Sequence, residues 1–141
     1  MSQKELEGLL FQAQKAIDSF EHSLAIKFLS RAFDLSSTSE IATQIGCCYL
    51  EVSSKDDSIK WFERALQIDE NCFGAWLQLA QLSFDSKSVD YYEKAIQILI
   101  HLTQKENHNN EFYSKQISNA YCALAEIYLT DLWFLKFNQV K

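Results

Sequence analysis

The chain has 141 residues, of which 48% are hydrophobic and 13% aromatic, so it is long enough for about one domain and too apolar for a disordered chain. Its 19 acidic and 13 basic residues give a formal net charge of -6, which argues against a nucleic-acid or anionic-membrane surface and permits a basic partner. Proline is absent and only three glycines occur, so long helices are permitted and we expect an all-α fold.

Apolar residues recur three and four positions apart along most of the chain, as they do in amphipathic helices. In the first segment they run from Leu6 to Phe20, and in the second from Leu24 to Leu35. Polar residues at 36–39 then interrupt the pattern. Further helices are predicted at about 40–52, 56–68, 73–84, 88–106 and 111–132, which makes seven helices with short connections.

Three segments share one internal pattern: FLSRAFDL at 28–35, WFERALQI at 61–68 and YYEKAIQI at 91–98. The helices that precede them also align, with small residues between large ones. A period of about 34 residues with this alternation resembles the tetratricopeptide repeat. The sequence therefore predicts a single repeat domain over 1–141, an α-solenoid of three helical hairpins with an unpaired seventh helix. Its expected parts are repeats at 6–38, 39–72 and 73–106, the first helix of a fourth repeat at 111–132, and an atypical tail at 133–141.

The repeat spacing has a physical reason. Two antiparallel helices approach closely only where one offers a small residue and the other fills the gap with a large one. In the second repeat, Gly46 and Ala65 supply the small residues, and Tyr49 and Phe62 supply the aromatic rings. We therefore expect these four residues to pack between the two helices of that hairpin.

Catalytic and metal-binding patterns are absent from the sequence. His22, His101 and His108 are far apart, and none lies three or four positions from another histidine or a cysteine. Cys47 and Cys48 suggest a redox pair, but adjacent residues on a helix point about 100° apart, which favours a packing role. Since no nucleophile elbow or phosphate-binding loop occurs either, we expect no enzyme activity, no metal and no cofactor.

Neither a targeting segment nor a membrane span is predicted. The N-terminal MSQKELEG lacks the basic and apolar regions of a signal peptide, and no window reaches the roughly 18 uncharged apolar residues that a span needs. The cysteines show no C-x-x-C spacing. We expect a soluble monomer in a reducing compartment, the cytosol or the nucleus, with no membrane partner.

A partner-binding surface is predicted on the first helices of the repeats, because stacked repeats usually hold ligands on that concave face. On these helices the positions that packing leaves free carry acids, amides and a few apolar residues, with no lysine or arginine. A solvated helix surface without a partner is the alternative interpretation, since exposed helices are commonly charged. The predicted partner-binding residues are Glu40, Glu51, Leu77, Gln81, Phe84, Asp85 and Glu126.

Three stretches indicate a narrower relationship: AWLQLAQLS at 75–83, YYEKAIQIL at 91–99 and ALAEIYLTDL at 123–132. They resemble the fungal dedicated assembly chaperone of large-subunit ribosomal protein four and its uncharacterised relatives. This resemblance implies a chaperone that binds the basic internal extension of that newly made ribosomal protein and shields it, without direct contact to nucleic acid. It also implies a function in ribosome biogenesis, in the cytoplasm and also in the nucleus together with the client.

The resemblance ends at Trp133, where WFLKFNQVK replaces the acidic stretch and further repeats of that family. Two interpretations remain open. Either the helix at 111–132 once received a further hairpin and the chain is a truncated form with reduced function, or this helix is the cap and 133–141 folds back. We prefer the first interpretation, because Tyr121, Ala125 and Tyr128 are suited to receive a partner helix. The alternative function is a scaffold or adaptor subunit of a multiprotein complex.

Overall fold

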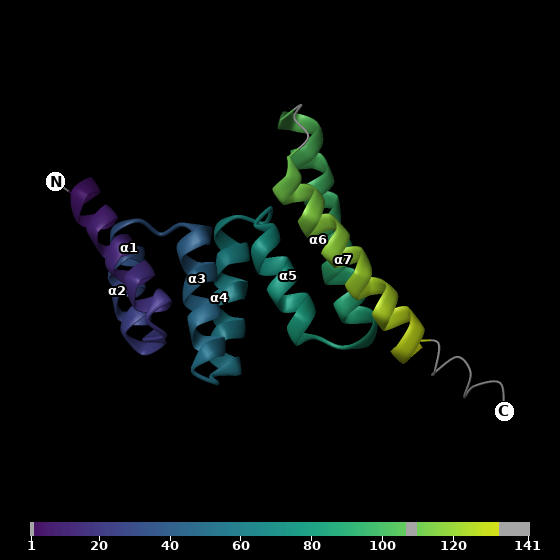
Figure 1. Ribbon diagram of the computed structural model, residues 1–141, viewed down its shortest axis with the longest axis horizontal. Coiled ribbons are helices and arrows are strands. Elements are labelled where there is room, and N and C mark those ends of the chain that lie inside the picture. Colours follow the sequence, from purple (N-terminus) through teal and green to yellow (C-terminus); the bar gives the residue numbers. More distant parts are fainter. Residues whose placement is uncertain (1, 107–109, 133–141) are drawn as a thin grey trace. The chain divides into compact units, whose positions relative to one another are not determined.

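The computed structural model describes residues 2–106 and 110–132. Within these ranges the chain consists of helices and turns and contains no strand (Figure 1). The predicted all-α class and the predicted succession of seven helices are confirmed for the described part of the chain. In order, the helices are α1 (Ser2–Asp18), α2 (His22–Leu35), α3 (Ser39–Glu51), α4 (Lys55–Ile68), α5 (Phe73–Leu82), α6 (Asp85–Glu106) and α7 (Glu111–Ile127), and a π-helical segment η1 (Tyr128–Leu132) follows α7.

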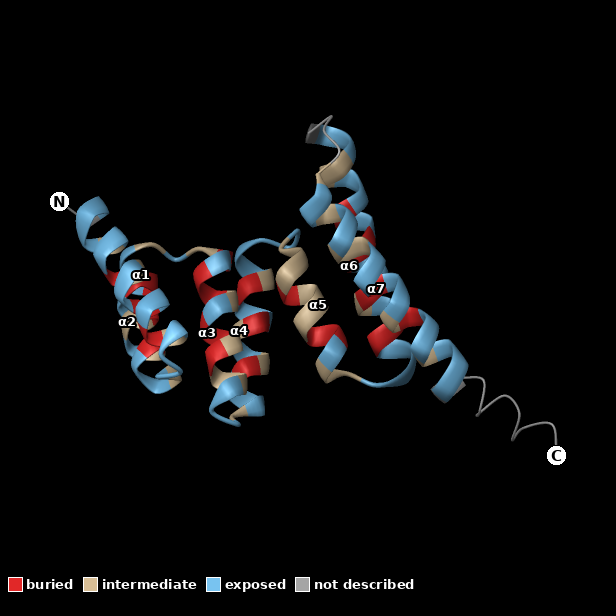
Figure 2. Cartoon of the chain, in the orientation of Figure 1, coloured by how far each residue is buried: buried red, intermediate tan, exposed pale blue. Residues whose placement is uncertain are grey.

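The chain divides into two compact units, Met1–Ala75 (unit 1) and Trp76–Lys141 (unit 2). In unit 1, α1 packs against α2, α2 against α3, and α3 against α4. The buried residues lie on one side of each helix, as the apolar periodicity predicts (Figure 2). Alanines occupy many of these contacts, and Ala25, Ala32, Ala42 and Ala65 are completely buried, which lets the helices approach closely.

The tightest contact in unit 1 joins α3 and α4 at Gly46. A β-carbon placed on Gly46 would lie 2.5 Å from Cε1 of Phe62, so the aromatic ring occupies the space that a side chain would need. Phe62 and Ala65 are fully buried, whereas Tyr49 is only partly buried. The predicted pairing of a small residue with an aromatic ring is therefore confirmed for Gly46 and Phe62.

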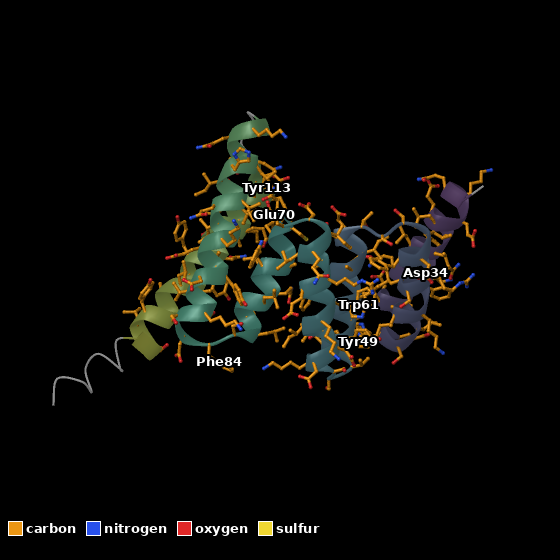
Figure 3. The ribbon with its side chains drawn as sticks, turned by 180° about the vertical axis from the view of Figure 1, so that it is seen from behind. Asp34, Tyr49, Trp61, Glu70, Phe84 and Tyr113 are labelled. Carbon is orange, nitrogen blue, oxygen red and sulfur yellow. The ribbon has the colours of Figure 1, made fainter. Side chains whose placement is uncertain are left out.

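An aromatic contact joins the second helices of the first two hairpins. Phe33 on α2 and Trp61 on α4 meet edge to face, with ring centroids 5.2 Å apart (Trp61 is labelled in Figure 3). The guanidinium carbon of Arg64 lies 4.7 Å from the centroid of the Phe33 ring and 5.0 Å from that of Trp61. This cation–π cluster holds α2 and α4 together without any charge pair.

The turns within the hairpins use residues other than glycine in the left-handed region. Phe20 follows α1, Ser53 follows α3 and Asp85 begins α6, with φ values of 60°, 63° and 55°. Such conformations are uncommon for residues with a β-carbon and persist where the surrounding structure imposes them. The three glycines lie inside helices, so the conformational freedom of glycine is not used at these turns.

In unit 2, α5, α6 and α7 enclose one apolar cluster. Its buried members are Ala80, Val89, Tyr92, Ile96, Ala120 and Leu124. The ring of Trp76 also lies against that of Tyr91, with centroids 5.6 Å apart. A buried hydrogen bond fixes the shortened turn between α5 and α6, because Oγ of Ser88 donates to the carbonyl oxygen of Ala80 at 2.7 Å. Two helices of a third hairpin thus pack against each other, and α7 packs against α6.

Candidate functional site

The first helices of the hairpins differ in charge from the second helices. Neither α3 nor α5 contains a lysine or arginine. Of the 13 basic residues in the chain, eight lie on α2, α4 and α6, which are the second helices. Within α3, Glu40 and Glu51 therefore have no lysine or arginine on their own helix, whereas α1 and α7 carry Lys4, Lys15 and Lys115.

In unit 1 the predicted acids lie at the two ends of α3. Glu40 is in the first turn and Glu51 is the last residue, and both are exposed. Eleven residues correspond to about three helical turns, so the two side chains emerge on nearly the same side of α3. The carboxylate of Glu51 also faces the imidazole of His22, with Oε2 4.0 Å from Nε2.

A pocket of about 240 Å³ lies beside Glu51, between the end of α1, the start of α2 and one side of α3. Ile17 and His22 line it from the first hairpin, and residues from Thr43 to Glu51 line it from α3. Nδ1 of His22 is buried and has no hydrogen-bond partner among the described residues. The pocket is mainly apolar. Its titratable lining groups are the imidazole of His22, the carboxylate of Glu51 and two thiols.

Those two thiols belong to Cys47 and Cys48, and their surroundings make them unreactive. Burial, the neighbouring Cys48 and the carboxylate of Glu51 raise the pKa of Cys47 to about 11. Burial and Glu51 also raise the pKa of Cys48. Both thiols are therefore neutral near pH 7 and act as apolar walls, in agreement with the packing role expected from the sequence.

In unit 2 the predicted residues have three different environments. Leu77 is partly buried and packs against the apolar cluster of this unit. Phe84 is 74% exposed at the turn between α5 and α6 (Figure 3), and Asp85 next to it is exposed as well. Gln81 and Glu126 are the residues of the set that the structure brings together, because both line one pocket.

This second pocket also has a volume of about 240 Å³ and lies between α5, the start of α6 and the end of α7. Polar groups dominate its lining, which includes Ser83, Tyr92 and Thr130 besides Gln81 and Glu126. Tyr92 is only 6% exposed, and burial together with the nearby Glu126 carboxylate raises the pKa of its hydroxyl. A buried phenol and a carboxylate therefore face the same small space.

The two pockets occupy equivalent places in their units. Four residues of α3 that line the first pocket each have a counterpart 79 positions later, on α7 or η1, that lines the second pocket. The pairs are Gln44 and Ala123, Cys47 and Glu126, Cys48 and Ile127, and Glu51 and Thr130. A pocket thus lies at matching positions of α3 and of α7 with η1, and the residues at those positions determine whether it is apolar or polar.

Sequence reasoning missed His22 and Tyr92 as pocket residues. The sequence indicates a structural or surface position for His22, and the YYEKAIQI segment indicates only a repeat. For Tyr92 a signal does exist, since the matching position of the second repeat is the apolar Phe62, and a hydroxyl at a buried position needs a polar surrounding.

Among residues 2–106 and 110–132, no three histidine, cysteine or acidic side chains are placed to hold a metal ion. None of the helices described there combines the length and the apolar character that crossing a bilayer requires.

Residues 39–72 match the family model described as tetratricopeptide repeat. The helical hairpins and the close contact of Gly46 with Phe62 are what a tetratricopeptide repeat requires, in agreement with this match. The chain has an all-α tetratricopeptide-repeat fold. Solved tetratricopeptide-repeat structures share this fold with it: the TPR domain of Sgt2 from Aspergillus fumigatus, for example, superposes with a TM-score of 0.63 at 18% identity, over 86% of this chain and 80% of that domain.

Two further proteins are similar to this tetratricopeptide-repeat chain. The structure of the assembly chaperone of RpL4 (Acl4) superposes with a TM-score of 0.70 at 20% identity, covering 90% of this chain and 56% of that one. Superkiller protein 3 of Saccharomyces cerevisiae is 32% identical over 96 residues, which are 65% of this chain and 6% of that protein. The chain thus spans about half of the length of the former and a small part of the latter.

Large side chains at the end of α7 and on η1 remain partly exposed among the described residues. Tyr121 is 53% exposed, Tyr128 49% and Leu129 70%. Tyr121, Ala125 and Tyr128 are the residues from which the sequence predicted a surface for a partner helix, and Ala125 is exposed as well. The tail at 133–141, to which the alternative of a folded-back cap refers, lies outside the described residues.

Proposed function

We propose that this chain is a non-enzymatic, peptide-binding chaperone that shields a newly made basic ribosomal protein during ribosome assembly. The observation that carries the proposal is the segregation of charge, which places Glu40, Glu51 and Glu126 on first helices that hold few basic residues. Basic side chains of a client would find carboxylates there with few competing lysines or arginines. The similarity in fold to the assembly chaperone of RpL4 supports this choice of client.

Charge complementarity between such a chaperone and its client raises the association rate and the selectivity for the client more than the affinity. Opposite potentials accelerate the encounter with a basic segment and exclude anionic competitors such as RNA. Exposed charge pairs are individually weak, typically below about 1 kcal/mol, so several must act together. Apolar contacts from residues such as Phe84 would add the part of the affinity that salt does not screen.

The test is a double charge reversal, Glu51→Lys with Glu126→Lys, and binding of a peptide that carries the basic internal extension of ribosomal protein four. We expect the reversal to abolish binding at about 0.15 M salt, where wild-type binding should survive. Glu63→Lys with Glu93→Lys is the matched control, because both acids are exposed on second helices and each pair of reversals changes the net charge equally.

A scaffold or adaptor subunit is the second candidate function, and the exposed apolar side chains of α7 favour it. A partner bound there would contact Tyr121, Tyr128 and Leu129 and would not depend on the acids of the first helices. Association that survives the Glu51 and Glu126 reversals but is lost in Tyr121→Ser would support the scaffold and would refute the chaperone proposal.

A further inference from the structure

The second pocket, between α5, α6 and α7, has the composition of a receptor for one cationic side chain. Among the residues that line it, Gln81, Tyr92 and Glu126 each carry a side-chain oxygen that can accept a hydrogen bond. They come from three helices, so the tertiary fold brings them together. Among the described residues, no lysine or arginine lines the pocket beside the carboxylate.

The burial of Tyr92 separates this pocket from an ordinary acidic surface. Tyr92 is only 6% exposed and belongs to the core cluster of unit 2, so packing restricts its side chain. Exposed side chains such as Gln81 and Glu126 lose conformational freedom when they bind, but the phenol is already ordered. The pocket therefore contains one preorganised group and two adaptable ones.

The size and the walls of the pocket indicate what can enter it. About 240 Å³ is less than the roughly 300–1,000 Å³ of pockets that hold drug-sized ligands, so the space suits a single side chain. Ala80, Ala123 and Ile127 give it apolar patches beside the acceptors, which suit the aliphatic stem of a long basic residue.

Arginine fits these acceptors better than lysine. A guanidinium presents five N–H donors in a planar fork and can serve several acceptors at once, whereas an ammonium is a compact and strongly hydrated charge. Several acceptors in one pocket therefore bind a guanidinium more strongly than an ammonium, because the guanidinium is more weakly hydrated and donates to several acceptors at once.

We propose that the pocket formed by Gln81, Tyr92 and Glu126 binds one arginine side chain of the client. This inference rests on the proposed function for its source of arginine, and it adds a specific recognition site to a general preference for basic segments. The guanidinium would pair with the carboxylate of Glu126 and donate to the oxygens of Gln81 and Tyr92.

The first experiment needs no client. N-acetyl-arginine amide is titrated into the labelled protein and followed by NMR, with N-acetyl-lysine amide and N-acetyl-citrulline amide as comparisons. We expect the arginine compound to shift resonances around Tyr92 and Glu126, with weaker shifts for lysine and none for the uncharged citrulline. Equal shifts for arginine and lysine, or shifts spread over all acidic surfaces, would overturn the proposal.

The second experiment compares variants in the same titration and in binding of the basic client peptide. Tyr92→Phe removes only the hydroxyl and keeps the buried ring, and Glu126→Gln removes the charge at nearly constant volume. Losing one hydrogen bond to a charged group should weaken binding by about tenfold or more. Glu111→Gln is the control, since it removes an equal charge from the first turn of the same helix.

The outcomes separate this proposal from the proposed function. If the wild-type chain binds the client peptide and Tyr92→Phe binds it equally well, the pocket is not an arginine site although the chaperone function stands. If the peptide does not bind but the arginine compound does, with the expected loss in both variants, the pocket proposal stands and the client is wrong. Should Tyr92→Phe unfold, Gln81→Ala at an exposed position provides the same comparison.

Discussion

The contact between α3 and α4 at Gly46 provides a stringent test of the fold. In Gly46→Ala the new β-carbon would lie 2.5, 2.8 and 2.9 Å from three carbons of the Phe62 ring. Carbon atoms prefer about 3.5–4.0 Å, so the ring has to move by roughly 1 Å. Phe62 is fully buried, so its ring can move only by displacing its neighbours, which makes this a case of overpacking.

The expected magnitude combines two opposing effects. Overpacking a well-packed core typically costs about 1–3 kcal/mol. Alanine is a better helix former than glycine by about 1 kcal/mol, which offsets part of that cost. Because three ring atoms are affected, we expect the upper part of the remaining range, a net loss of about 1–2 kcal/mol in the free energy of unfolding.

The assay is urea denaturation followed by far-ultraviolet circular dichroism, with Gly8→Ala as the matched control. A β-carbon on Gly8 meets nothing within 4 Å, so this variant should keep or gain up to about 1 kcal/mol. Adding Phe62→Leu to Gly46→Ala should recover part of the loss, which gives a coupling energy for the pair. The reasoning is refuted if Gly46→Ala is as stable as Gly8→Ala.

Two further predictions concern a helix end and a thiol. The side chain of Asn110 accepts hydrogen bonds from the backbone N–H groups of Phe112 and Tyr113, so Asn110→Ala should cost about 1 kcal/mol in thermal denaturation, and Asn110→Asp, which keeps the acceptor, should not. Equal losses would show that the cap is not formed. Since the pKa of Cys47 is about 11, its alkylation by iodoacetamide should lag far behind that of the exposed Cys122 near neutral pH and accelerate with each pH unit up to about 11. Rapid modification of Cys47 at neutral pH would contradict its burial.

The candidate site was only partly predictable from the sequence. Periodicity identifies which side of a helix faces solvent, and it correctly leaves Glu40, Glu51, Gln81 and Glu126 exposed. It does not indicate which of them share a pocket, because that depends on neighbouring helix ends. Leu77 shows the limit, since it packs against the core cluster of unit 2 although the sequence placed it on the partner-binding face.

By itself the sequence determined the helices, their repeat period and the residues that pack between paired helices. These features are local or repeat along the chain, so a short-range pattern such as Gly46 with Phe62 is enough to encode them. Only the tertiary structure decided how the hairpins turn, with Phe20, Ser53 and Asp85 in the left-handed region. It also decided that Tyr92 and Glu126 line the same pocket, a placement of two helices that no periodicity within one helix can specify.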